Sequence, residues 1–322
     1  MPDTTRTQIP AEVNNFYDQV LLIRAVPLNV HAAFGQTRNI QKKAGSNTIK
    51  FRRYGALAVA TTALTEGTKP AGSQLSVTDI TAAALQYGDF VTITDVVDEQ
   101  SIDPVLTETA EIFGEQMGET NDLLTRDVLV AGTVVQYAST ATSRVTVAAG
   151  MVLNAAEIRE AVRTVKVAKA RKITAISGAS PGIGTVPIWS CFVGIVHPRG
   201  SFDLKGVTGF ETPEKYAPNT VLLPGEVGRL DEVRFVESAN AKLFAGAGAG
   251  AIDVYATMIL GAQAYGVVDL GNSQNVGFIF KPLGSAGSAD PLNQIQSAGW
   301  KEYFVAKILN DNFMVRIEHA VS

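Results

Sequence analysis

The clearest pattern of apolar and polar positions lies in the first half of the chain and predicts one long helix. Apolar residues recur at about every 3.5 positions from Val105 to Val128, which is the spacing of one helix face. Pro104 is suited to the first helical position, and Gly132 can end the helix. A helix over 103–131 would be about 43 Å long at 1.5 Å per residue, far longer than the average globular helix.

Two shorter helices are predicted on either side of this one. The apolar residues between positions 13 and 23 fall near helical spacing, which indicates a short amphipathic helix in an N-terminal arm. A further helix is expected over 154–172. Asn154 would be its cap, and Glu157 three residues later would be the partner in a capping box.

The second half of the chain predicts strands separated by Gly and Pro. Strand-like runs cover 186–198, 229–238 and 252–270. The final run alternates, with Phe313, Val315 and Ile317 expected to face inward and Met314, Arg316 and Glu318 outward. The pattern indicates an α+β protein in which one long helix braces two sheet regions.

The segment 45–97 is the least globular part of the pattern. A strand-like run, TIKFRRY, leads into a long stretch of Ala, Thr, Gly and Pro and returns through a second run over 86–97. Loops longer than about 12–15 residues are uncommon in compact domains, and a two-stranded arm is at best marginally stable alone. We therefore expect this arm to lie on another subunit. The cations Lys50, Arg52 and Arg53 would discourage unwanted strand pairing at its edge.

The composition favours a large hydrophobic core and argues against a protein whose main function is to bind nucleic acid. Hydrophobic residues make up 46% of the 322 residues and charged residues only 18%. The net charge is −4, whereas non-specific nucleic-acid binding is driven by Lys and Arg. Two clusters of cations are the exception, and the second is expected to be a solvated helix face. They are Lys42, Lys43, Lys50, Arg52 and Arg53, and then Arg159, Arg163, Lys166, Lys169, Arg171 and Lys172.

Cysteine usage and the terminus point to a reducing compartment. Cys191 is the one cysteine and lies in an apolar run, so we expect a small core residue and neither a disulfide nor a cysteine-based metal site. The first ten residues are polar and predict no signal peptide. The Gly-rich stretch 243–268 is too weakly apolar to predict a membrane span.

One glycine pattern resembles the phosphate loop of short-chain dehydrogenases. The segment ISGASPGIGTVP contains Gly178, Gly182 and Gly184, and Tyr303 and Lys307 match the Y-x-x-x-K pair of that family. The residues after the glycines are strand-like, so no helix N-terminus is offered to a pyrophosphate. The dehydrogenase hypothesis is kept as a remote alternative.

No other residues are expected to assemble into a catalytic or metal site. His31, His197 and His319 are isolated in the sequence, and a satisfied structural histidine is the better interpretation of each. The neighbouring acids Asp98/Glu99 and Asp231/Glu232 would point to opposite faces if they lie on strands. We therefore predict a protein that is not an enzyme and has no cofactor.

The order of these parts resembles the major capsid proteins of tailed bacteriophages, which have the Hong-Kong-97-type fold. The nearest resemblance is to the phage-N4-like major capsid subfamily. Four motifs carry it: IKFRRYGAL, ALTEGTKP, QYGDFVTITD and WKEYFVAKILNDNFMVRIEHA. The resemblance covers essentially the whole chain.

The resemblance implies a division of the chain into five parts. These are an N-terminal arm over 1–44, an extended E-loop over 45–97, a peripheral domain with the spine helix over 98–149, an axial domain over 150–270, and closing strands of the peripheral domain over 271–322. The residues expected to take part in assembly lie within the motifs and are Arg52, Arg53, Glu66, Lys69 and Tyr87. Lys69 is also a candidate, by location only, for a covalent Lys–Asn cross-link between subunits.

The resemblance also implies a function and partners. The chain would self-assemble into hexamers and pentamers of an icosahedral shell around double-stranded DNA, in a virion built in the host bacterial cytoplasm. A separate scaffolding protein and a portal protein are the expected partners, with a decoration protein as a further candidate. An encapsulin-like compartment shell shares the fold and is the main alternative, distinguished by protein cargo in place of DNA.

Overall fold

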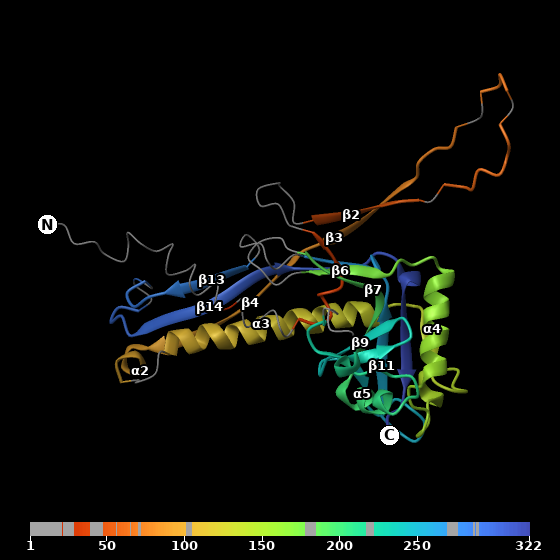
Figure 1. The fold of residues 1–322 in the computed structure, drawn as a ribbon. Coiled ribbons are helices and arrows are strands. Elements are labelled where there is room, and N and C mark those ends of the chain that lie inside the picture. The colour runs from red at the N-terminus through yellow and green to blue at the C-terminus, as the bar shows by residue number, and fades with distance from the viewer. Residues whose placement is uncertain are drawn as a thin grey trace.

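The computed structural model describes residues 21, 29–38, 48–55, 57–64, 66–69, 72–100, 105–177, 185–216, 222–268, 276–285, 287 and 290–322. The described chain has three parts (Figure 1). A long helix lies along a narrow sheet at one end, and a broader sheet with two helices forms the other end. A two-stranded arm projects from the region between them.

The predicted long helix is confirmed. Helix α3 spans Val105–Val130 and follows the short helix α2, Asp95–Gln100. Against α3 lies an antiparallel sheet in the order β13-β14-β4. Its strands are β4 Leu85–Thr94, β13 Val276–Lys281 and β14 Ile295–Phe304.

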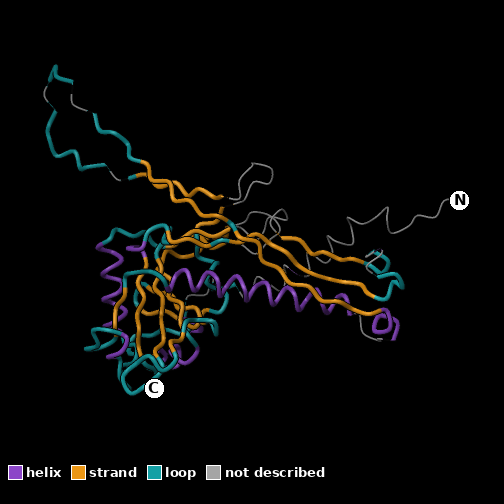
Figure 2. The backbone as a smooth tube through the Cα atoms, turned by 180° about the vertical axis from the view of Figure 1, so that it is seen from behind, coloured by secondary structure: helices purple, strands orange, loops and turns teal. Residues whose placement is uncertain are grey.

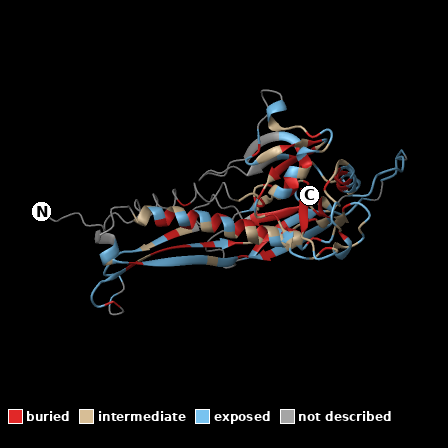
Figure 3. Ribbon diagram, turned by 90° about the horizontal axis from the view of Figure 1, so that it is seen from below, coloured by how far each residue is buried: buried red, intermediate tan, exposed pale blue. Residues whose placement is uncertain are grey.

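An apolar core joins α3 to this sheet. Buried and exposed positions alternate along the helix (Figure 3), as expected for a helix with one face on a sheet. The core residues are Leu21, Ala110, Phe113, Met117, Phe278, Ala298 and Trp300. Burial of each large side chain contributes about 1.5–3 kcal/mol. Of the predicted helix over 13–23, Leu21 alone lies within the described residues.

The broader sheet has eight strands and mixed directions. Its main order is β5-β16-β11-β7-β9-β8, with β10 paired to β11 and β6 paired to β7. The strands are β5 Val135–Tyr137, β6 Ile173–Ser177, β7 Thr185–Val196, β8 Glu226–Leu230, β9 Val233–Glu237, β10 Leu243–Phe244, β11 Val254–Leu260 and β16 Met314–His319. Helix α4 spans Ala155–Val167 and α5 spans Pro198–Lys205. Apolar residues of α4, including Ile158 and Val162, share a core with Ile259 and Val315 of the sheet.

Two small sheets complete the described fold. One has the order β1-β12-β15, and the other is the arm, β2-β3. Their strands are β1 Gln36–Arg38, β12 Tyr265–Val268, β15 Ala306–Ile308, β2 Thr48–Tyr54 and β3 Val77–Ala83. Short 3-10 turns occupy Arg144–Thr146, Pro213–Lys215 and Asp311–Phe313. Strands of the predicted closing segment 271–322 thus enter three different sheets.

The partner of the first arm strand differs from the expectation. β2 pairs with β3 over its whole length, not with the strand-like run over 86–97. That run instead belongs mainly to β4, which pairs with β14 from Leu85↔Phe304 to Thr94↔Ile295. Its last residues, Val96 and Val97, are helical and belong to α2. Apolar alternation identified the strands but carries no information on which strand each one meets.

The prediction that β16 has an outward face is wrong. Met314, Arg316 and Glu318 are as buried as their neighbours. β16 is an interior strand between β5 and β11, and both of its faces are covered. Met314 packs beside Gly132 at the end of α3, while the two charged side chains bind partners. Phe313, expected to face inward on the strand, is half-buried in the preceding 3-10 turn.

The predicted cap of α4 is confirmed, but the capping box is not. The Asn154 side chain accepts hydrogen bonds from the backbone N–H groups of Ala156 and Glu157. The Glu157 carboxylate turns away from the cap and accepts hydrogen bonds from the Ser139 backbone N–H at 2.7 Å and from Gln136 Nε2 at 3.0 Å. Glu157 therefore fixes the loop after β5 to α4.

Helix α4 ends before the predicted position 172. Lys169 adopts the left-handed conformation, with φ of 59°. Its N–H donates to the Lys166 carbonyl at 2.8 Å, and the Ala170 N–H donates to the Val165 carbonyl at 3.1 Å. These two hydrogen bonds form a Schellman motif, which is usually built on glycine, so the sequence offered no stop signal here.

The neighbouring acids are not on strands. Asp231 and Glu232 form the turn between β8 and β9, and Asp231 has a φ of 52°. Both carboxylates face α4 and its flank rather than opposite sides of a sheet, and their partners are Arg159, Lys166 and Lys172. Asp98 and Glu99 lie in α2. The α4 cations are thus an exposed face, as predicted, with counter-charges from a turn.

Candidate assembly surface

The arm is held firmly at its base. β2 and β3 pair from Thr48↔Ala83 to Tyr54↔Val77. Ile49 and Phe51 are buried at this end. A side chain at Gly266 of β12 would place its Cβ 2.4 Å from the Phe51 ring, so the missing side chain of Gly266 makes room for Phe51. The arm therefore has a fixed root in the core.

Beyond this root, the arm carries no core of its own. The Gly55 N–H donates to the Ser76 carbonyl at 2.9 Å, and every described residue of 57–64, 66–69 and 72–76 is exposed. Figure 2 shows the arm standing clear of the body. Its exposed apolar side chains are Leu57, Val59, Leu64 and Leu75. Since the arm has no core to bury them, these side chains are available for contact with another surface.

Two of the predicted assembly residues lie together near the root of the arm. Arg52 Nε donates to Asp79 Oδ1 at 3.0 Å across the hairpin. This hydrogen bond raises the pKa of Arg52 and lowers the pKa of Asp79. Arg53 is exposed and, as the next residue of the strand, points to the opposite face. The two faces of the arm thus each carry a cation.

The other three predicted residues are spread over the molecule. Glu66 and Lys69 lie in the distal part of the arm and are exposed. Tyr87 is on β4 and is half-buried, where it packs against the core under α3 and against the core of the small sheet. The structure therefore places four of the five on the arm and Tyr87 in the body.

The face of α3 that turns away from its sheet is acidic. Ile112 is 62% exposed on this face. The acidic stripe of α3, as we name it, consists of Glu108, Glu111, Glu115 and Glu119. Like charges at this spacing disfavour a helix by about 0.2–0.5 kcal/mol per pair. The exposed carboxylates of Glu108 and Glu119 make this face complementary to a cationic surface.

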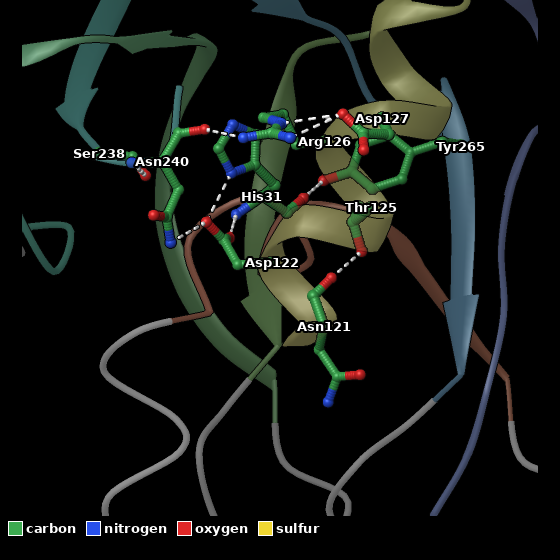
Figure 4. A network of polar contacts seen from close by, with 9 residues as sticks. All are labelled: His31, Asn121, Asp122, Thr125, Arg126, Asp127, Ser238, Asn240 and Tyr265. Carbon is green, nitrogen blue, oxygen red and sulfur yellow. Dashed lines mark hydrogen bonds and ion pairs between the residues drawn. The ribbon is translucent and has the colours of Figure 1, made fainter. Parts of the chain in front are cut away.

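A buried polar network fixes α3 to three other segments (Figure 4). Asp122 Oδ1 accepts from the His31 backbone N–H at 2.6 Å, and its Oδ2 lies 2.9 Å from His31 Nδ1. Asn240 Nδ2 donates to Asp122 Oδ2 at 3.3 Å. Tyr265 donates its hydroxyl to the His31 carbonyl, and burial raises the pKa of that hydroxyl. The middle of α3 is thus tied to the segment before β1, to the turn after β9, and to β12.

A second buried network joins the end of α3 to the broader sheet. Arg144 donates two hydrogen bonds to Glu318, at 2.8 and 2.7 Å. Arg316 Nε donates to the same carboxylate at 2.9 Å. Arg316 Nη1 donates to the backbone carbonyls of Val130 and Gly132, where a cation is favoured by the helix dipole. Glu318 is fully buried, and these two arginines are its ion-pair partners.

The three histidines are structural, as predicted. His31 is paired with Asp122. His197 caps α5 by accepting a hydrogen bond from the backbone N–H two residues on. His319 is buried, with Nε2 2.9 Å from Thr257 Oγ1. His197 and His319 come together around the Tyr255 ring, which the sequence did not predict, and burial lowers the pKa of both.

Tyr303 and Lys307, the described residues of the dehydrogenase hypothesis, lie on different strands. Tyr303 lies near the end of β14, and Lys307 lies on β15 in another sheet. The glycines of 178–184 lie outside the described residues, and β7 begins after them at Thr185, as the sequence predicted. Cys191 is a buried core residue, and burial raises its pKa to about 11, which makes it a poor nucleophile.

The described part of the chain offers neither a metal cluster nor a membrane-spanning helix. No group of three or more His, Cys, Asp or Glu residues there could hold a metal ion. None of the described helices combines the length and the apolar character that a membrane span needs.

Comparison with known proteins identifies the fold. No protein-family model and no curated protein sequence matches the chain. Solved structures do match. The capsid of Ralstonia phage GP4 has a TM-score of 0.70 at 11% identity, over 92% of this chain and 88% of that one. The head of Helicobacter pylori bacteriophage KHP40 has a TM-score of 0.65 at 13% identity, over 90% and 88%. An encapsulin of Synechococcus elongatus has a TM-score of 0.50 at 12% identity, over 89% and 85%.

The chain therefore has the Hong-Kong-97-type capsid fold. The likeness extends along nearly the whole of both chains, and the expected fold class is confirmed. Identities of 11–13% establish the fold alone.

Proposed function

We propose that this chain is the major capsid protein of a tailed bacteriophage, of the phage-N4-like subfamily. It assembles into hexamers and pentamers of an icosahedral shell that encloses double-stranded DNA. The observation that carries the proposal is the arm: an exposed segment with apolar side chains and no core of its own, rooted in a fold shared with phage capsids. A net charge of −4 suits a shell that holds DNA without binding it tightly.

The expected division of the chain gives each part a place in the shell. The E-loop is the arm of β2 and β3 within the expected span 45–97, whose last part, β4, pairs with β14 in the body, and α3 is the spine of the peripheral domain. Residues 150–270 form the axial domain, whose loops meet at the centre of each hexamer or pentamer. Residues 1–44 are the N-terminal arm, and 271–322 supply closing strands. Scaffolding and portal proteins are the partners for assembly in the host cytoplasm, with a decoration protein as a further candidate on the finished virion.

We propose further that each arm covers the acidic stripe of α3 in a neighbouring subunit. The charges are complementary, since Lys50 and Arg53 lie near the root of the arm, where Arg52 is already paired with Asp79. The apolar contribution comes from arm residues such as Val59, which is 82% exposed, and from Ile112 of the stripe. Each contact is weak, but closed symmetry repeats it many times, so the shell gains high avidity without any tight single interface.

A charge-reversal experiment tests this arrangement. The double variant Glu108→Lys/Glu119→Lys should raise the protein concentration needed for shell assembly by roughly 2- to 30-fold. This range corresponds to the loss of two exposed ion pairs, each of which contributes about 0.2–1 kcal/mol. Adding Lys50→Glu and Arg53→Glu on the arm should restore assembly. Light scattering against protein concentration measures both effects.

Glu214→Lys is the matched control, because Glu214 is exposed in a 3-10 turn outside both surfaces. It should assemble like the unaltered chain. If the double variant in α3 assembles normally, the arm does not cover the acidic stripe.

Two alternatives make different predictions. An encapsulin-like compartment shell has the same fold, and one such structure is among the matches, but its shells would contain cargo protein and no DNA. A short-chain-dehydrogenase-like protein would bind a nicotinamide cofactor at micromolar levels and lose that binding on Gly182→Asp. This second alternative is disfavoured because Thr185, which follows the glycines, begins strand β7 and not a helix.

A further inference from the structure

One carboxyl group is buried in the contact between α3 and its sheet. Glu302 lies on the inner face of β14, between the buried aromatic residues Trp300 and Phe304. It is fully buried. Neither of its carboxyl oxygens accepts a hydrogen bond from the described residues. A buried polar group without a partner is costly, so its presence at this position requires an explanation.

The residue of α3 that lies beside Glu302 is also unpaired among the described residues. Asn121 is fully buried, and neither its side-chain oxygen nor its side-chain nitrogen makes a hydrogen bond. The next residue, Asp122, is held by His31 in the network of Figure 4. The apolar seam between α3 and β14 thus contains a carboxyl group and a carboxamide side by side, at the point where α3 is anchored to other segments.

Within the described residues, no cation neutralises Glu302. Tyr87 of β4 lies directly opposite Glu302 in the strand register, and on α3 the residue after Asn121, Asp122, is bound by His31. Because ionisation in this site would leave an uncompensated buried charge, burial raises the pKa of Glu302 to about 8, while the neighbouring Asn121 carboxamide acts in the opposite direction.

We propose that Glu302 is a proton-sensing residue that controls the packing of α3 on β14. With its carboxyl group protonated, the seam is closed. When the proton is lost, the carboxylate must reach water, and β14 separates from α3 around Asn121. The contact between α3 and β14 would then act as a proton-controlled hinge within the subunit. This role of Glu302 does not depend on shell formation.

The direction of the effect is set by linkage between protonation and folding. The pKa of Glu302 is higher in the folded state than its ordinary value of 4.5, so the folded chain holds an extra proton between about pH 4.5 and pH 8. The stabilisation is complete below this window and is lost as pH rises through it. Within the window, the folding equilibrium constant falls by up to about tenfold per pH unit.

The test uses the full-length chain and the variant Glu302→Gln, which imitates the protonated side chain. The denaturant concentration at the unfolding midpoint should be measured at each pH for both chains. As the pH is raised from 5 to 9, the midpoint of the unaltered chain should decrease relative to that of Glu302→Gln. The protection factors of the backbone amides of α3 around Asn121, which are corrected for the intrinsic pH dependence of hydrogen exchange, should fall above pH 8 in the unaltered chain alone. Infrared spectra at pH 7 should show one protonated carboxyl group that is absent from the variant.

Glu119→Gln is the matched control, since it removes a carboxyl group from the exposed face of the same helix. It should show the same pH dependence as the unaltered chain. Equal pH dependence for the unaltered chain and Glu302→Gln, or no protonated carboxyl band at pH 7, would overturn the proposal. All three readouts use the subunit, so a failure of the proposed capsid function would be seen separately, as an absence of shells.

Discussion

Replacing residues 57–75 by a short turn should abolish shell formation and leave a folded subunit. The described part of this segment is exposed throughout, so its removal takes nothing from the core. The Gly55 N–H already donates to the Ser76 carbonyl at 2.9 Å, so the two strands can be joined at that point. The buried root residues Ile49 and Phe51 are kept. Sedimentation and electron microscopy should find subunits or small oligomers only.

The design of this truncation matters. A deletion of 56–84 would also remove β3, leaving β2 without its partner, and loss of assembly could then reflect misfolding. The short-turn variant should keep the circular dichroism spectrum and thermal midpoint of the unaltered subunit. A second variant, in which Leu57, Val59, Leu64 and Leu75 are all changed to Ser, keeps the arm length and should also fail to assemble. Shells of normal geometry from either variant would show that the arm is not the assembly element.

The second large effect is expected at Glu318. Glu318→Ala should lower the free energy of unfolding by about 3–5 kcal/mol, the usual result of breaking a buried ion pair by removing one partner. It leaves Arg316 buried without its counter-charge and frees Arg144. Arg316 also holds the carbonyls at the end of α3, so the contact between the long helix and the broader sheet should loosen. Denaturant unfolding of the subunit measures the change.

A surface pair provides the comparison. Glu160 and Arg163 on α4 form an ion pair at 2.9 Å with both side chains largely exposed. Glu160→Ala should change the free energy of unfolding by less than about 0.5 kcal/mol. If Glu318→Ala were no more harmful than Glu160→Ala, the buried network would not be what joins α3 to the broader sheet.

Helix α3 shows what could be predicted from the sequence. Its apolar period continues long enough to define both the element and its length, because one face meets a sheet along its whole course. The arm was predicted for the opposite reason, since a long segment without an apolar stripe cannot form a core. The pairing of β2 with β3 could not be predicted, because alternation specifies which face a side chain takes and not which strand lies beside it.

The strand β16 shows why part of the buried site was missed. The alternation in β16 predicts one buried and one solvent-exposed face, but every residue of the strand is buried. Arg316 and Glu318 are buried because they neutralise each other, a relation between strand neighbours that a hydrophobic pattern cannot express. Glu302 had a signal: it is the polar member of an inward-facing series with Trp300 and Phe304, and such an exception at period two predicts a buried polar residue.

Residues that act between subunits are the least predictable from one sequence. The motifs predict assembly roles for Arg53, Glu66 and Lys69. All three are exposed on the arm, so their predicted role depends on contact with a second subunit. Tyr87 came from the same kind of motif but packs within the body. A motif fixes local chemistry, whereas the partner surface is set by the geometry of the assembly.

Electron microscopy of the purified chain, alone and together with a scaffolding protein from the same genome, is the most direct test of the proposed capsid function. We predict closed shells, capsomer rings or curved sheets, and DNA within shells recovered from infected cells. Shells that contain a cargo protein and no DNA would support the shell-forming role of the fold and the arm, but would favour the encapsulin-like compartment over the phage capsid. A uniform small oligomer under every condition would contradict the assignment of a shell-forming role.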